Sequence, residues 1–466
     1  MTTFEADLAW SGPGSPPVPA AHISTGPDGS IASVNSAAKR NEEVRKVALP
    51  GFVNAHSHCF HRALRGRSET KAGDFWTWRD FMYQAAARLT PETYEELATY
   101  VYAEMLLAGY TTVGEFHYLH HGEGGQPYDD PNEMGWALLR AAQRSGIRLT
   151  LIDACYLQAS VDGAPLEGVQ RRFGDGSGEK WSSRVDRLTG TGAFGNEDAA
   201  EEPTLDKPRL AVAIHSVRAV PETAMATVVG LAGANGWPIH AHLSEQRAEN
   251  EACLKETGLT PTDLLGRAGA WTHLTTAVHA THLSPADVSR LGLAGTFICA
   301  CGTTERDLGD GVGPFAELTE AGCRLCVGSD SHAVIDPFEE TRSLELNQRL
   351  AHERRGVTPS EELLAAGTVA GAASLGWPSA GLAVGGLGDL VLLRTDTPRL
   401  AGTSLGPTTD GPGLAAVVVF AAAPPDVETV VVGGEVVVEN GEHVRLGPPA
   451  AVAERLDRAV RRLFDD

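Results

Sequence analysis

The sequence predicts an α/β fold, a (β/α)8 barrel of the TIM type with a small β-sandwich domain built from both chain ends. Two observations carry this prediction. Through the middle of the chain, eight apolar strand-like runs alternate with helical patterns, which is typical of a parallel sheet. At both ends lie short β-like segments punctuated by Gly and Pro, and neither set is long enough to form a core alone.

Eight repeats of strand and helix favour a closed barrel, in which the chemistry lies at the carboxyl ends of the strands. A doubly wound open sheet is the alternative, but no glycine-rich phosphate loop follows the first run. Helical patterns separate most runs, for example 91–108, which follows Thr90 as a predicted N-cap. The eight runs are 50–56, 111–116, 148–155, 209–214, 238–242, 275–279, 295–299 and 324–328.

We therefore place the small β domain at 1–48 and 384–448, the barrel at 49–383, and a helix packing on the body at 449–466. In that helix Val452, Leu456, Val460 and Phe464 are spaced four apart.

Residues 158–207 are rich in Gly, Ser and charge, and we expect a long loop that is a lid or a disordered insertion. The β-like segments of the two ends are 21–24, 30–34, 389–393, 415–420 and 427–432, the last joined to 436–438 by a glycine turn.

Charge, hydropathy and cysteine content disfavour several classes of function and location. The net charge of −22 over 466 residues disfavours a nucleic-acid partner or an anionic membrane surface. No apolar run reaches membrane-spanning length, and no secretory signal is visible at the start. Seven scattered cysteines fit a reduced, cytoplasmic compartment. The Cys299–Cys301 and Cys323–Cys326 pairs lie in apolar runs, so we interpret them as buried side chains and not as metal ligands.

Polar side chains collect where the predicted strands end. Two imidazoles one residue apart on a strand point to the same face, so a His-x-His pair can hold one ion. Because the strand ends of a barrel meet at one rim, we expect these side chains to converge there. They are His56 and His58; Glu115, His117 and Tyr118; His215 and Arg218; His240, His242 and Glu245; His279; and Asp330.

Three imidazoles and one carboxylate suit a single divalent ion, zinc above all and Fe²⁺ as the alternative, with a position left for water. We assign His56, His58, His242 and Asp330 as its ligands. A metal-bound water needs proton carriers that are not ligands, and we assign Glu245 and His279 to that role, with Asp330 assisting. The role of His240, in the same strand as His242, stays open.

This pattern, together with the flanking β segments, resembles the amidohydrolase superfamily over nearly the whole chain. Members with two metals carry a carboxylated lysine after the fourth strand, where this chain has His215, so the resemblance implies one ion. The spacing from His242 to Glu245 is similar to the branch that deaminates amidine-type groups, and it implies that Glu245 protonates the substrate nitrogen. A homodimer is also implied.

Four longer motifs are similar to those of the N-formimino-L-glutamate deiminase family, whose substrate carries two carboxylates and a terminal amidine. The resemblance implies that Arg79 and Arg218 bind the carboxylates, with Tyr118 and His215 as hydrogen-bond partners. Guanidinium groups pair with carboxylates in a two-pronged geometry, which an acidic protein needs for such a ligand. The motifs are the segments 74–83, 115–121, 215–220 and 242–246.

His61 departs from the family pattern, which has Gln at this position next to the substrate. His61 can replace that Gln as a donor, or it can shift the preference to a related formimino compound or a formamide. Two other functions stay open. A deaminase of purine or pyrimidine-like rings would need stacking aromatics instead of two arginines, and a non-catalytic barrel would have lost ligands.

Overall fold

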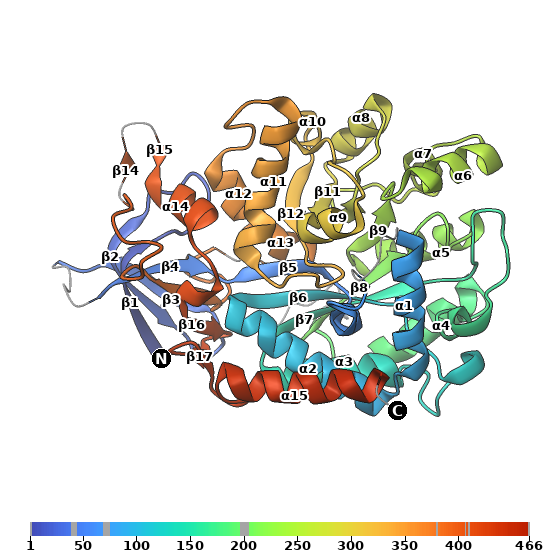
Figure 1. Ribbon diagram of the computed structural model, residues 1–466, viewed down its shortest axis with the longest axis horizontal. Helices are drawn as coiled ribbons and strands as arrows, with labels where there is room; N and C mark the ends of the chain where they lie inside the picture. Colours follow the sequence, from blue (N-terminus) through green and yellow to red (C-terminus); the bar gives the residue numbers. More distant parts are fainter. Residues whose placement is uncertain are drawn as a thin grey trace.

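The computed structural model describes residues 2–38, 44–68, 75–195, 205–378, 381–405, 407–408 and 411–464. Its centre is a parallel eight-stranded sheet in the order β12-β11-β10-β9-β8-β7-β6-β5 (Figure 1). The predicted barrel is thereby confirmed. The strands are β5 (Phe52–Ser57), β6 (Tyr110–His117), β7 (Arg148–Cys155), β8 (Arg209–Ile214), β9 (Ile239–Leu243), β10 (Thr275–His279), β11 (Phe297–Ala300) and β12 (Arg324–Val327).

The barrel closes where β12 meets β5. The amide of Asp330 donates to the carbonyl of His56 at 3.0 Å, and the amide of His58 donates to the carbonyl of Asp330 at 3.1 Å. Gly328 permits this approach, because a Cβ there would lie 2.7 Å from the carbonyl oxygen of His56. Closure therefore brings a residue from the end of the eighth strand beside two from the first.

Helices surround the barrel. Helix α2 shows how the sequence sets their ends: Thr90 caps it with a capping box, Pro91 begins it, and Gly109 ends it in a left-handed conformation. The helices are α1 (Phe75–Arg88), α2 (Pro91–Ala108), α3 (Glu133–Ser145), α4 (Gly178–Thr189), α5 (Glu222–Asn235), α6 (Arg247–Thr257), α7 (Pro261–Arg267), α8 (Pro285–Ala294), α9 (Gly302–Leu308), α10 (Phe315–Ala321), α11 (Pro337–His352), α12 (Ser360–Ala366), α13 (Val369–Ser374), α14 (Gly413–Ala421) and α15 (Pro449–Phe464).

A second eight-stranded sheet is built from both ends of the chain, in the order β18-β17-β16-β13-β4-β1-β2-β3. Its two halves join where β13 pairs antiparallel with β4. In Figure 1 the blue and red strands lie together beside the barrel. The strands are β1 (Thr2–Ala9), β2 (Val18–Thr25), β3 (Ile31–Ser36), β4 (Lys46–Pro50), β13 (Leu390–Arg394), β16 (Val427–Val432), β17 (Glu435–Glu439) and β18 (Glu442–His443); β14 (Pro407–Thr408) and β15 (Gly411–Pro412) pair separately.

The predicted β segment 415–420 is wrong, because these residues form α14. Leu414, Ala415, Val418 and Val419 are buried there, a helical spacing that packs against α11 and α12. Tertiary packing has overridden the strand preference of a valine-rich run. The glycine turn after 427–432 is confirmed, since Val432 pairs with Glu435.

The described residues of the region 158–207, where we expected a long loop, contain regular helical elements. These elements are the 3-10 helix η3 (Gly168–Arg172) and the helix α4, which Ser177 caps. Residues 196–204 lie outside the described part. At the end of the chain, α15 packs against α2 with Val452, Leu456, Ala459 and Leu463 buried (Figure 1).

Among the described helices, we find none with the length and apolar character needed to cross a membrane.

Candidate active site

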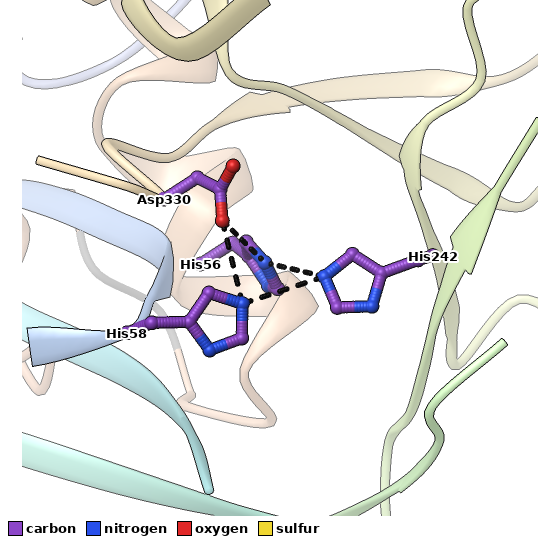
Figure 2. A group of neighbouring side chains, drawn as sticks. All are labelled: His56, His58, His242 and Asp330. Carbon is purple, nitrogen blue, oxygen red and sulfur yellow. Dashed lines mark hydrogen bonds and ion pairs between the residues drawn. The ribbon is translucent and has the colours of Figure 1, made fainter. Parts of the chain in front are cut away.

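Four predicted ligands converge at the carboxyl ends of β5, β9 and β12 (Figure 2). The Nε2 atom of His242 lies 3.1 Å from Nε2 of His56 and 3.4 Å from Nε2 of His58. The Oδ1 atom of Asp330 lies 3.3 Å from Nε2 of both His56 and His58. An ion bonded to four such atoms at zinc-like distances would space them about 3.3–3.6 Å apart at tetrahedral angles. The four residues therefore fit one ion.

The hydrogen bonds behind the cluster fix which nitrogen faces inward. Nδ1 of His58 donates to the carbonyl of Phe116 at 3.0 Å, and Nδ1 of His242 donates to the carbonyl of His215 at 2.9 Å. Burial lowers the pKa of both imidazoles well below its usual value, so the rings are neutral. Their Nε2 lone pairs then point at one another, an arrangement that a cation between them makes favourable.

Glu115 holds the turn that carries the first two ligands. It is buried at the end of β6 and accepts from the hydroxyl of Ser57 at 2.6 Å and from the amide of Cys59 at 2.7 Å. Burial raises the pKa of Glu115 to about 7, against the effect of these hydrogen bonds. This strand-end carboxylate thus orients the ligand-bearing turn and lies outside the ligand set.

The two predicted proton carriers lie beside the fourth ligand. Nε2 of His279 is 3.8 Å from Oδ2 of Asp330 and 3.9 Å from Oε1 of Glu245, and its Nδ1 is 3.5 Å from Glu305. Burial opposes charging of His279, but these carboxylates outweigh it and raise its pKa to about 10. Burial also raises the pKa of Glu245. A raised carboxyl pKa favours the protonated form that a general acid needs.

A cavity opens next to this cluster and contains the remaining predicted residues. Nε2 of His61 lies 3.0 Å from the hydroxyl of Tyr118, and burial lowers the pKa of His61 to about 3, so its ring is neutral. The guanidinium of Arg79 lies over the ring of Tyr83, 5.4 Å from its centre. The predicted residues that line the cavity are His58, His61, Arg79, Tyr118, His215, Arg218, His242, Glu245, His279 and Asp330.

The structure therefore brings the predicted substrate residues into one cavity with the predicted ligands and proton carriers, while their catalytic roles stay predictions. Of the residues assigned as ligands, proton carriers or substrate contacts, His56 is the one that does not line the cavity, because it is fully buried behind it. His240, whose role was open, is buried below the cluster, and its Nε2 lies 3.3 Å from the carbonyl of Ser374. It packs against α13 and is not among the converging ligands.

Several lining residues were not singled out from the sequence. Tyr156 and Phe173 come from the segment after β7, and Trp78, Met82 and Tyr83 come from α1. Gln170 in η3 donates to the hydroxyl of Tyr83 at 3.0 Å and links the two covering segments. Aromatic residues in the irregular segment 158–195 were the available signal, but spacing alone does not indicate which of them turn inward.

A second buried group contains His117, His120 and Asp153. Here the carboxylate already has a cation: Arg184 donates to both oxygens of Asp153 at 2.7 Å, and Nε1 of Trp181 adds a bond at 2.9 Å. Nδ1 of His120 lies 3.3 Å from Nε2 of His117. These contacts give the buried carboxylate a cation from within the chain, while Nδ1 of His117 is buried without a hydrogen-bond partner among the described residues.

Comparison with known proteins agrees with this site. A sequence profile of the Amidohydrolase family matches residues 47–437. Formimidoylglutamate deiminase of Pseudomonas aeruginosa is 37% identical over 428 residues, which cover 89% of this chain and 90% of that protein. The 8-oxoguanine deaminase of Pseudomonas aeruginosa is 30% identical over 365 residues, 77% of each chain.

Solved structures share the fold. An amidohydrolase from Brucella melitensis superposes with a TM-score of 0.87 at 30% identity, over 100% of both chains. A zinc-bound adenosine deaminase from Xanthomonas campestris superposes with a TM-score of 0.80 over 99% of this chain and 98% of that one. At 20% identity, the second likeness shows the architecture alone.

Proposed function

Because this chain belongs to the Amidohydrolase family, we propose that it deiminates N-formimino-L-glutamate to N-formyl-L-glutamate and ammonia. Family and homology identify it as a hydrolase of C–N bonds, and the choice of substrate is our inference. The observation that carries the inference is one cavity that contains both the metal-ligand cluster and two arginines, Arg79 and Arg218. The metal-ligand cluster suits a terminal amidine, and the two arginines suit two carboxylates.

The cluster of His56, His58, His242 and Asp330 would hold one divalent ion, and we propose zinc. When bound, such an ion lowers the pKa of a coordinated water to roughly 7 and makes hydroxide available at neutral pH. Oδ2 of Asp330 can accept the proton that water loses, and His279, whose raised pKa keeps its ring protonated, lies 3.8 Å away and can carry a proton toward Glu245.

Glu245 lies on the same side of the cavity, within 3.9 Å of His279, and can pass a proton on to the substrate. The oxygen of water adds to the formimino carbon, and the bond from that carbon to its terminal nitrogen breaks. Ammonia leaves in preference to the substituted amine only if the terminal nitrogen receives the proton. Glu245 is the protein's proton donor for that nitrogen.

A ring deaminase is the second candidate, and the cavity gives it specific support. Trp78, Tyr118, Tyr156 and Phe173 line the cavity and offer faces on which a purine could stack. Ammonia release from N-formimino-L-glutamate, guanine, 8-oxoguanine, adenosine and cytosine separates the two. We expect release from the first compound alone; preferential release from a ring would overturn the proposal.

Three further properties belong to this proposal: a cytoplasmic location, a homodimeric assembly and a place in histidine breakdown. The seven cysteines are all unpaired, which supports a reducing compartment. The homodimer rests on the family resemblance. Light scattering of the purified protein tests it, with a mass of twice 49.1 kDa expected.

A further inference from the structure

Glu249 lies on the first turn of α6, which follows the strand β9 that carries His242 and the turn that carries Glu245. Its side chain is completely buried, although no sequence motif pointed to it. A buried carboxylate needs partners that stabilise its charge, and two partners are present. One of them is Arg218, and the other is the backbone beside Glu245.

The contacts of Glu249 reach two parts of the site. Its Oε2 lies 2.8 Å from Nε of Arg218, and its Oε1 accepts from the amide of Ser244 at 2.9 Å. Ser244 has a φ of +50°, a left-handed conformation that is unusual for a residue with a side chain. Glu249 therefore ties the turn after β8, which carries Arg218, to the strained turn that carries Glu245 into the cavity.

Two carboxylates compete for Arg218. Nη2 of Arg218 is 3.5 Å from Oε2 of Glu245, longer than a normal charge-assisted hydrogen bond. Its Nε forms an ion pair with Oε2 of Glu249 at 2.8 Å, without the alignment of a hydrogen bond. With Glu249 at the Nε edge, the guanidinium is kept from closing a side-on, two-pronged pair with Glu245 through Nε and Nη2. Such a pair would occupy the Arg218 donors that a substrate carboxylate needs, and it would also occupy Glu245, the proposed proton donor.

We propose that Glu249 is a positioning residue that holds the Arg218 guanidinium off Glu245 and keeps it available for a substrate carboxylate. The inference rests on the proposed function for the identity of that carboxylate. Its structural part, the position of Arg218, does not depend on the substrate.

Crystal structures of the native protein and of Glu249→Gln test the structural part. In E249Q we expect an Arg218 nitrogen within about 3 Å of a Glu245 oxygen, the distance of a charge-assisted hydrogen bond. Glu249→Asp, which retains the charge but has a shorter reach, serves if E249Q does not fold. An Arg218 that keeps its native position in the variant overturns the proposal.

Kinetics test the consequence, with Glu345→Gln as the matched control. Glu345 is also buried, pairs with an arginine (Nε of Arg349, 2.7 Å) and accepts from a backbone amide (Thr358, 2.8 Å), but it does not line the cavity. Both variants lose a buried charge, so both are expected to melt at lower temperature. E249Q should also raise KM tenfold or more, and E345Q should leave KM within twofold.

A double-mutant cycle tests whether Glu249 acts through Arg218. In an Arg218→Met background, E249Q should change KM less than twofold, because the group it positions is gone. Equal effects of E249Q with and without Arg218 would reduce Glu249 to a fold-stabilising residue and overturn the proposal. If the native protein releases no ammonia from N-formimino-L-glutamate, the proposed function fails instead, and the crystal structures decide on Glu249.

Discussion

The predicted ligand cluster of His56, His58, His242 and Asp330 and the second cluster of His117, His120 and Asp153 have similar composition but differ in the groups that face their carboxylates. In the first, three Nε2 atoms and one carboxylate oxygen face one another at 3.1–3.4 Å. In the second, Asp153 is bound at both oxygens by Arg184, and the imidazole of His120 contacts His117 and a backbone carbonyl.

The difference lies in where the counter-charge comes from. The second cluster supplies its own cation in the form of a guanidinium, so burial of the carboxylate is balanced within the chain. In the first cluster, the neutral rings offer lone pairs, and Asp330 faces the His279 imidazolium at 3.8 Å without the close two-pronged contact that Arg184 makes with Asp153. Composition alone therefore does not identify a metal site, whereas the direction of the donors and the partner of the carboxylate do.

Removal of one imidazole from each cluster should produce the largest contrast. His242→Ala should lose the metal and at least roughly a thousandfold in turnover, because activated water is lost with the ion. His120→Ala should keep one ion per chain. Elemental analysis and an ammonia assay measure both properties, and equal metal loss in the two variants would contradict the distinction.

Arg184→Met tests the second cluster. Arg184 pairs with two buried carboxylates, Asp153 at 2.7 Å and Asp175 at 2.9 Å. The substitution leaves both without this cation and should cost about 3–5 kcal/mol in the free energy of unfolding. Urea unfolding measures this cost. Arg140→Met is the matched control, because Arg140 pairs with Glu95 and Glu133 at the surface and should cost less than about 1 kcal/mol.

Low pH should weaken the ion pairs that Arg184 makes with Asp153 and Asp175. Burial alone would raise the pKa of Asp153 and Asp175, but the Arg184 guanidinium outweighs it and both pKa values are lowered. The stability that these pairs contribute is therefore present above the unfolded pKa of about 4 and is lost as pH falls further. Unfolding of native protein and R184M between pH 7 and pH 3 should show a steeper loss in the native protein.

Glu245→Gln separates proton transfer from metal binding within the first cluster. The variant should retain one ion per chain and lose roughly a hundredfold or more in kcat, as expected for a lost general acid. Metal analysis and initial rates give both numbers. Normal turnover by E245Q would remove Glu245 from the reaction.

His61→Gln should give the smallest effect. The amide can still reach the hydroxyl of Tyr118, which now lies 3.0 Å from Nε2 of His61, and burial keeps the histidine uncharged. We expect KM to change less than about tenfold, the equivalent of one hydrogen bond. His61→Ala, which removes the contact, should raise KM more, and a reversed order would exclude this contact from substrate binding.

The barrel and the ligand cluster could be predicted because their signals are local and repeat. Strand-end residues such as His58 and Asp330 follow apolar runs, and the topology of a closed parallel barrel brings all such ends to one rim. No knowledge of side-chain packing is needed for that step. The convergence in Figure 2 is the expected result.

The other features of the fold and site depend on side-chain packing, which the sequence pattern does not specify. A valine-rich run at 415–420 has a strand preference, yet it forms α14 because α11 and α12 bury one face of it. In the sequence Glu249 is an acidic residue in the first turn of a helix, and only the structure shows its contact with Nε of Arg218 at 2.8 Å. Phe173 reaches the cavity through an irregular segment without periodicity.

The most direct test of the central claim is X-ray diffraction from crystals of the native protein on both sides of the zinc absorption edge. We predict one anomalous peak per chain, within about 2.0–2.2 Å of Nε2 of His56, His58 and His242 and of one oxygen of Asp330. Metal-replete crystals with no peak there, or with the peak at His117, His120 and Asp153, would contradict the account.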